Sequence, residues 1–85
     1  MNILFICKYN RFRSKVAEAI FNKLNENSNI QAESAGFTLD VLKPYTEQSV
    51  ISIMKNKGYE IKGKPRIAEK NLIENFDGII VVADD

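Results

Sequence analysis

The chain has 85 residues, of which 45% are hydrophobic, and a formal net charge of +1. This length predicts one domain, residues 1–85, with a modest core. The near-neutral charge indicates neither a nucleic-acid nor a membrane partner, and the single cysteine excludes an intrachain disulfide or a thiolate metal cluster. The apolar stretch after Met1 and Asn2 is too short for an export signal or a membrane span, so we expect a cytoplasmic protein.

The first half of the chain predicts two strands that flank a helix. Residues 2–7 form a continuous apolar run, which is typical of a strand buried on both faces of a parallel sheet. Residues 14–25 carry apolar side chains at helical spacing. Residues 30–34 alternate between apolar and polar, as expected for a strand at the sheet edge with one wetter face. A loop should follow over residues 36–45.

The second half continues the alternation. We expect a helix that begins near Thr46 as its cap and stops at Gly58. A short third strand over 59–61, a brief helix over 68–74 and a buried fourth strand over 78–83 should follow. Strands that alternate with helices favour a parallel sheet with right-handed crossovers.

The most informative segment joins the first strand to the first helix. Five residues separate Cys7, at the end of the strand, from Arg13 and Ser14 at the start of the helix. A connection of this kind can turn backbone N–H groups inward into an anion-binding concavity, and the helix N-terminus adds partial positive charge. The Arg13 guanidinium fits two oxygens of a phosphate-like group. Since such a field favours the thiolate, the spacing predicts an oxyanion site in which Cys7 is the nucleophile.

The loop side chains have expected roles of their own. Asn10 tolerates a left-handed backbone and can tie the loop to itself, and Ser14 can donate its hydroxyl to the sulfur. Tyr9 and Phe12 offer aromatic contacts to an aryl substrate. The alternative is a purely structural role, in which a cysteine that ends a buried strand is only a small core residue. The candidate substrate-binding residues are Lys8, Tyr9, Asn10, Arg11, Phe12 and Arg13.

This segment resembles the phosphate-binding loop of the low-molecular-weight protein tyrosine phosphatases and their arsenate reductase relatives. Weaker similarity continues through Lys64-Pro65-Arg66 to residues 76–80, so the resemblance covers nearly the whole chain. It implies an α/β three-layer sandwich with a four-stranded parallel sheet in the order 2-1-3-4, shortened at the C-terminus. It also implies catalysis by Cys7, Arg13 and Ser14 without a metal or another cofactor. The matching residues are Cys7, Asn10, Arg13, Ser14, Ala17, Glu18 and Ala19, followed by Ser34-Ala35-Gly36.

Several residues depart from the pattern of that family. Tyr9 stands where the family usually has Gly, and Phe12 stands where a second Cys is common. Without that second thiol, Cys7 cannot form a protective internal disulfide. Gly63 falls near a position where relatives often carry a His that supports the loop asparagine.

The largest departure is the general acid. Relatives carry an Asp on an Asp-Pro loop beyond the point where this chain stops, and the chain has no Asp-Pro dipeptide. Asp40, Asp84 and Asp85 are the local candidates, each of which is more simply read as a solvated carboxylate. The helices that relatives place after the fourth strand also lack a counterpart. We therefore expect the open sheet face to be covered by self-association or by a separate partner, unless the chain is a fragment.

Three functions remain open at this point. The first is a phosphatase that acts on phosphotyrosine or small aryl phosphates, with a phosphorylated substrate or other phosphate-like oxyanion as its ligand. The second is an arsenate reductase that borrows external thiols, because Cys7 has no internal partner to resolve a mixed disulfide. The third is a non-catalytic oxyanion-binding or regulatory domain that lacks the acid.

Overall fold

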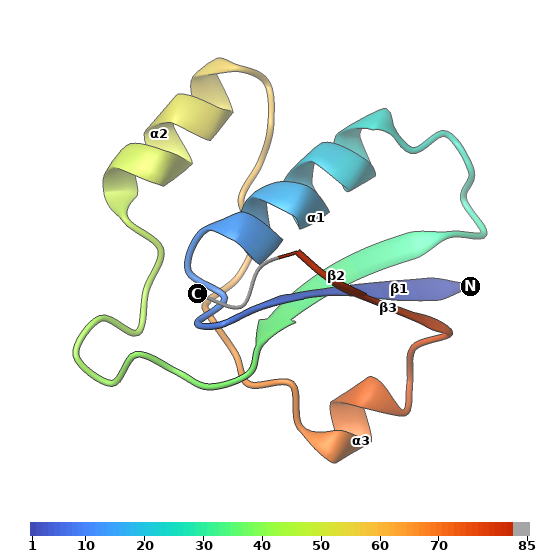
Figure 1. The fold of residues 1–85 in the computed structure, drawn as a ribbon. Helices are drawn as coiled ribbons and strands as arrows, with labels where there is room; N and C mark the ends of the chain where they lie inside the picture. The colour runs from blue at the N-terminus through green and yellow to red at the C-terminus, as the bar shows by residue number, and fades with distance from the viewer. Residues whose placement is uncertain (83–85) are drawn as a thin grey trace.

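The computed structural model describes residues 1–82, and within them the strands form one parallel sheet in the order β2-β1-β3 (Figure 1). Strands and helices alternate over the first half of the chain as predicted, whereas two helices follow one another before the last strand. The elements in chain order are β1 (Asn2–Cys7), α1 (Arg13–Leu24), β2 (Gln31–Gly36), α2 (Gln48–Asn56), α3 (Lys70–Ile73) and β3 (Gly78–Val81).

The central strand β1 positions the rest of the sheet. It pairs with β2 along its whole length, from Asn2 opposite Gln31 to Cys7 opposite Gly36. On its other side it pairs with β3, so the apolar run of residues 2–7 is flanked by strands on both edges. Because all three strands of residues 1–82 are parallel, their carboxyl ends meet at one edge of the sheet, which is where Cys7 lies.

The two faces of β1 pack against different helices. The Phe5 ring lies 5.9 Å from the Phe21 ring of α1, measured between centroids. Leu4 and Ile6, which point to the opposite face, are almost fully buried on the α3 side. Figure 1 shows α1 and α3 on opposite sides of the sheet, so the structure has the three layers that the resemblance implied. The core cluster on the α3 side consists of Leu4, Ile6 and Ala35, with Ala68, Leu72 and Phe76 packed against it.

The predicted third strand over residues 59–61 is wrong. Gly58 and Gly63 bracket this segment with φ angles of +88° and +72°, so the chain turns at both ends before a strand can extend. The N–H of Tyr59 bonds to the carbonyl of Met54 at the end of α2 instead of to a neighbouring strand. The sheet of residues 1–82 accordingly has three strands rather than four, and β3 takes the place beside β1.

Other predicted elements are present with shifted bounds. Helix α1, strand β2 and the short α3 each begin or end within a few residues of expectation, and β2 alternates between exposed and buried as predicted. Thr46 is not the cap of α2: Glu47 holds that position, without a hydrogen bond from its side chain. The Thr46 hydroxyl is buried and has no hydrogen-bond partner among the described residues.

Strand β3 was predicted to be buried, and this is wrong. Its residues Ile79, Ile80 and Val81 are 42–55% exposed, because β3 is an edge strand within residues 1–82. Ala83, the last residue of the predicted strand, lies outside the described residues. In the described part of the chain, no helix combines the length and the apolar character needed to cross a membrane.

We expect Leu4→Ala to lower the free energy of unfolding by about 2–5 kcal/mol, because the side chain is fully buried between the sheet and α3. Urea denaturation followed by circular dichroism measures the change. The control is Leu42→Ala, since Leu42 is 86% exposed and should change stability by less than about 0.5 kcal/mol. Equal losses in the two variants would contradict this assignment of the core.

Candidate active site

The predicted nucleophile and guanidinium lie at the two ends of one short loop. Cys7 is the last residue of β1, and Arg13 is the first residue of α1. The thiol is free and nearly buried. A cavity of about 130 Å³ opens at this point, lined by Cys7, Tyr9, Arg11, Phe12 and Arg13.

The amino end of α1 carries no competing negative charge. Phe12 is the N-cap residue, and within residues 1–82 no side chain caps the helix. The first turn contains no acidic residue, and helical bonding begins with the Val16 N–H donating to the Phe12 carbonyl. The partial positive charge of the helix end is therefore available to an anion in the adjacent cavity.

A chain of buried hydrogen bonds runs beneath the loop to the sulfur. The backbone N–H of Arg66 donates to Asn10 Oδ1 at 3.1 Å. Because a backbone N–H can only donate, this bond assigns the oxygen of the Asn10 amide and turns its Nδ2 toward Ser14. Nδ2 donates to Ser14 Oγ at 2.7 Å, and Ser14 Oγ lies 2.9 Å from Cys7 Sγ.

The direction of these bonds determines what the serine can do. The Ser14 oxygen accepts from Asn10 and keeps its hydroxyl hydrogen, which it donates to the Cys7 sulfur when that sulfur is a thiolate, because a thiolate can only accept. A donor aimed at sulfur stabilises the thiolate more than the thiol. Asn10 has a φ of +54°, which fits the left-handed backbone expected of this residue. The predicted contact between Ser14 and the thiol is present, and its part in catalysis stays a prediction.

Gly36 allows the end of β2 to approach this loop. The N–H groups of Phe37 and Thr38 donate to the carbonyls of Cys7 and Lys8, both at 3.0 Å. A Cβ atom at Gly36 would lie 2.9 Å from the Lys8 carbonyl oxygen, and equally close to the Asn10 nitrogen. Gly36 ends the Ser34-Ala35-Gly36 motif, and this close approach gives its glycine a role.

Two of the predicted substrate-binding residues direct their charged groups elsewhere. Lys8 is exposed, and its ammonium lies 5.1 Å from the centroid of the Tyr9 ring. The Arg11 guanidinium bonds to the Tyr45 carbonyl at 2.8 Å and to Glu47 at 2.7 Å. It also lies 5.6 Å from the centroid of the Tyr45 ring, so Arg11 joins the loop to the segment before α2.

Of the three candidate acids, Asp40 lies within the residues that the structure describes. The Asp40 carboxylate accepts hydrogen bonds from the N–H groups of Leu42 and Lys43. These bonds close a turn within residues 40–43. Asp84 and Asp85 lie outside the described residues. A larger cavity of about 430 Å³ beside the end of α2 includes neither Cys7 nor Arg13 among the residues that line it.

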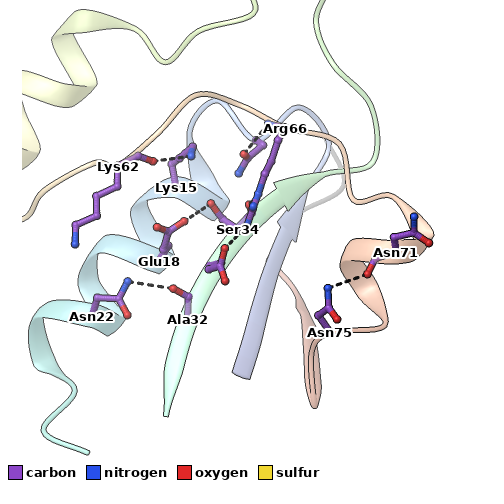
Figure 2. A network of polar contacts seen from close by, with 11 residues as sticks. Lys15, Glu18, Asn22, Ala32, Ser34, Lys62, Arg66, Asn71 and Asn75 are labelled. Carbon is purple, nitrogen blue, oxygen red and sulfur yellow. Dashed lines mark hydrogen bonds and ion pairs between the residues drawn. The ribbon is translucent and has the colours of Figure 1, made fainter. Parts of the chain in front are cut away.

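Sequence reasoning missed Arg66 and its partners. The Arg66 side chain donates from Nε to the Ser34 carbonyl at 2.9 Å and from Nη2 to Glu33 at 2.7 Å. The hydroxyl of Ser34 donates to the buried Glu18 carboxylate of α1 (Figure 2). The similarity at Lys64-Pro65-Arg66 was the available signal, but only the fold shows what it contacts.

Sequence reasoning also missed Lys15. Its side chain is buried, with 4% of the residue exposed, and its Nζ donates to the Lys62 carbonyl at 2.7 Å (Figure 2). A lysine in the first turn of a helix is usually solvated, so the sequence pointed only to added positive charge near the loop.

Comparisons with known proteins agree with this geometry. Residues 2–85 match the model of a family described as low molecular weight phosphotyrosine protein phosphatase. A comparison with curated proteins returned no match.

Solved structures with the same fold include phosphatases and arsenate reductases. An arsenate reductase from Archaeoglobus fulgidus is 32% identical, with a TM-score of 0.78 over 93% of this chain and 60% of that one. A protein tyrosine phosphatase from Entamoeba histolytica is 26% identical, with a TM-score of 0.79 over 95% and 55%. A low molecular weight protein tyrosine phosphatase from T. tengcongensis is 23% identical, with a TM-score of 0.81 over 95% and 57%. The chain thus spans between 55% and 60% of the length of these structures.

We expect Gly36→Ala to weaken oxyanion binding about fivefold or more, because the added methyl group pushes against loop backbone that cannot yield easily. Protection of Cys7 from iodoacetamide by inorganic phosphate measures the affinity. Gly78→Ala is the matched control, since a Cβ there would meet its nearest neighbour at 3.9 Å. Unchanged protection in Gly36→Ala would show that the loop does not depend on this contact.

Lys15 should make stability depend on alkaline pH. Burial lowers its pKa from 10.5; the charge of Glu18 opposes this effect and that of Arg66 adds to it. Between the lowered pKa and 10.5 the unfolded chain binds more protons than the folded one, so stability rises with pH in that window. Urea unfolding across this range should show the rise in the wild type and a smaller rise in Lys15→Met. Identical slopes in the two proteins would contradict the assignment.

Proposed function

Because the chain belongs to the low molecular weight phosphotyrosine protein phosphatase family, we propose that it hydrolyses phosphotyrosine or small aryl phosphates through a cysteinyl-phosphate intermediate. The observation that carries this proposal is the Ser14 hydroxyl 2.9 Å from the Cys7 sulfur, at the amino end of α1. Arg13 lines the same cavity as the thiol.

In the first step the Cys7 thiolate attacks phosphorus in line with the aryl oxygen. A sulfur–phosphorus bond forms, the bond from phosphorus to the aryl oxygen breaks, and the aryl oxide leaves with the electron pair. Arg13 and the N–H groups at the start of α1 bind the equatorial oxygens, and their interaction strengthens as charge redistributes. Tyr9 and Phe12, at the cavity wall, contact the aryl ring.

In the second step water attacks the phosphorus of the cysteinyl-phosphate. The sulfur–phosphorus bond breaks, phosphate is released, and the sulfur departs as a thiolate that the Ser14 hydroxyl stabilises. The proton of the attacking water goes to the phosphate product or to solvent. Ser14 therefore acts on the sulfur in both steps, first as nucleophile and then as leaving group.

Substrates differ in whether their leaving group must be protonated as it departs. A general acid typically contributes about 10²- to 10⁴-fold to such a reaction. Aryl oxides of low basicity leave without a proton, whereas alkoxides do not. We therefore expect residues 1–85 to act faster on activated aryl phosphates than on alkyl phosphates.

Rapid mixing with p-nitrophenyl phosphate tests the proposal. The wild type should release about one equivalent of nitrophenol in a burst and then turn over slowly, because the covalent intermediate accumulates. Cys7→Ser and Arg13→Ala should abolish the burst, while Lys23→Ala, an exposed change on α1, should retain it. Circular dichroism confirms that each variant is folded.

The opposite result identifies a binding domain. If the wild type gives neither burst nor turnover, yet binds phosphate with an affinity that Arg13→Ala abolishes, the phosphatase proposal fails. The chain would then be an oxyanion-binding module.

Arsenate reduction is the second candidate, and the 32% identity to the Archaeoglobus fulgidus arsenate reductase favours it. Arsenate copies phosphate in shape and charge. Cys7 would displace water to form a sulfur–arsenic bond, and an external thiol would attack the Cys7 sulfur. That attack releases arsenite and leaves a mixed disulfide, which a second external thiol reduces. Arsenite formation that requires glutathione and is lost in Cys7→Ser would support this function.

A further inference from the structure

Lys15 is buried beside the nucleophile loop without taking part in the cavity. It is the third residue of α1, directly after Ser14, and only 4% of it is exposed. The residues that line the cavity of Cys7 and Arg13 do not include it. Its ammonium instead donates to the carbonyl of Lys62 at 2.7 Å, so it acts on the chain segment that runs from Lys62 to Arg66.

That segment is attached to the rest of the molecule at both ends. At one end Lys15 holds the Lys62 carbonyl, and a Cβ at Gly63 would lie 3.6 Å from the same ammonium nitrogen. At the other end the Arg66 side chain bonds to Ser34 and Glu33 of β2. Figure 2 shows Lys15 beside Lys62 and Arg66 beside Ser34, with the hydrogen bond between Ser34 and Glu18 close by.

The same segment supports the loop asparagine. The Arg66 N–H donates to Asn10 Oδ1 at 3.1 Å, and the Arg66 carbonyl accepts from the Gly36 N–H at 2.7 Å. Asn10 in turn donates to Ser14, which contacts the Cys7 sulfur. Lys15 is therefore connected to the nucleophile through backbone atoms of the segment and through two buried polar side chains.

We propose that Lys15 is a positioning residue: its ammonium holds the segment 62–66 where the Arg66 amide orients Asn10, and thereby orients Ser14 toward Cys7. This inference rests on the proposed function and deepens it, because Lys15 would shape the oxyanion site without lining its cavity.

The energetics of burial distinguish this role from a purely structural one. Burial is the largest effect on the Lys15 pKa and lowers it, which means that the site disfavours the ammonium. A buried ammonium carries a desolvation cost that an apolar side chain of similar volume does not. Within residues 1–82 the ammonium offsets part of this cost with a hydrogen bond to the Lys62 carbonyl, in the segment that supports Asn10.

The test compares Lys15→Met with Lys23→Met, an exposed position on the same helix. Iodoacetamide labelling of Cys7 at increasing concentrations of inorganic phosphate gives the apparent dissociation constant, and thermal unfolding gives the melting temperature. Lys15→Met should weaken phosphate binding about three- to tenfold, because only part of the free energy of the lost hydrogen bond is transmitted to the site. Its melting temperature should be unchanged or higher. Lys23→Met should alter neither quantity.

Amide hydrogen exchange supplies a second readout that does not depend on phosphate. The Arg66 amide should exchange faster in Lys15→Met than in the wild type, because its hydrogen bond to Asn10 Oδ1 opens more often. This measurement also separates the inference from the proposed function. If the wild type neither binds phosphate nor turns over substrate, the phosphatase proposal fails, whereas the exchange rate still decides the role of Lys15.

Several results would overturn the positioning role. Unchanged phosphate protection and unchanged Arg66 exchange in a folded Lys15→Met protein would do so. A loss of binding that disappears at about 0.5 M salt would assign the effect to the field of the lysine charge instead. If Lys15→Met does not fold, Lys15→Gln is measured in the same way, and failure of both to fold would make Lys15 a structural residue.

Discussion

The site depends on one hydrogen bond with a forced direction. The Arg66 backbone N–H can only donate, so the Asn10 side chain must present its oxygen to it and its nitrogen to Ser14. The Ser14 oxygen is then an acceptor on one side, which leaves its hydrogen for the Cys7 sulfur. The orientation of the side chains beside the nucleophile thus depends on a backbone group from a distant part of the chain.

The parallel sheet explains how these distant groups meet. The carboxyl ends of β1 and β2 lie side by side, with Cys7 opposite Gly36. Gly36 then bonds to the backbone on both sides of Ile67, which brings Arg66 to the same edge. Since Gly36 lacks a Cβ, the loop after Cys7 can lie directly against it. One sheet edge therefore collects the nucleophile, the loop and the segment that supports the loop.

The charges near the loop serve two different purposes. Arg13 lines the cavity, where its guanidinium can meet an anion. Arg11 also lines this cavity, but its guanidinium pairs with Glu47 and connects the loop to the segment before α2. Arg66 pairs with Glu33 and connects β2 to the segment 62–66. The cluster of basic residues in and after the loop favours a local attraction for small anions. The structure adds that the guanidinium groups of Arg11 and Arg66 also bond to backbone carbonyls and to glutamates, so these two charges hold chain segments together.

The sequence by itself determined the parts that depend on neighbours along the chain. The apolar run of residues 2–7, the helical spacing after Ser14 and the five residues between Cys7 and Arg13 require only local backbone geometry, and all appear as predicted. Tertiary structure decided which strand lies beside β1 and what Arg66 contacts. A three-residue run resembles a strand whether or not a partner is present, and Asn10 and Arg66 are 56 positions apart. Pairings of this kind depend on how the whole sheet assembles, and no local pattern encodes them.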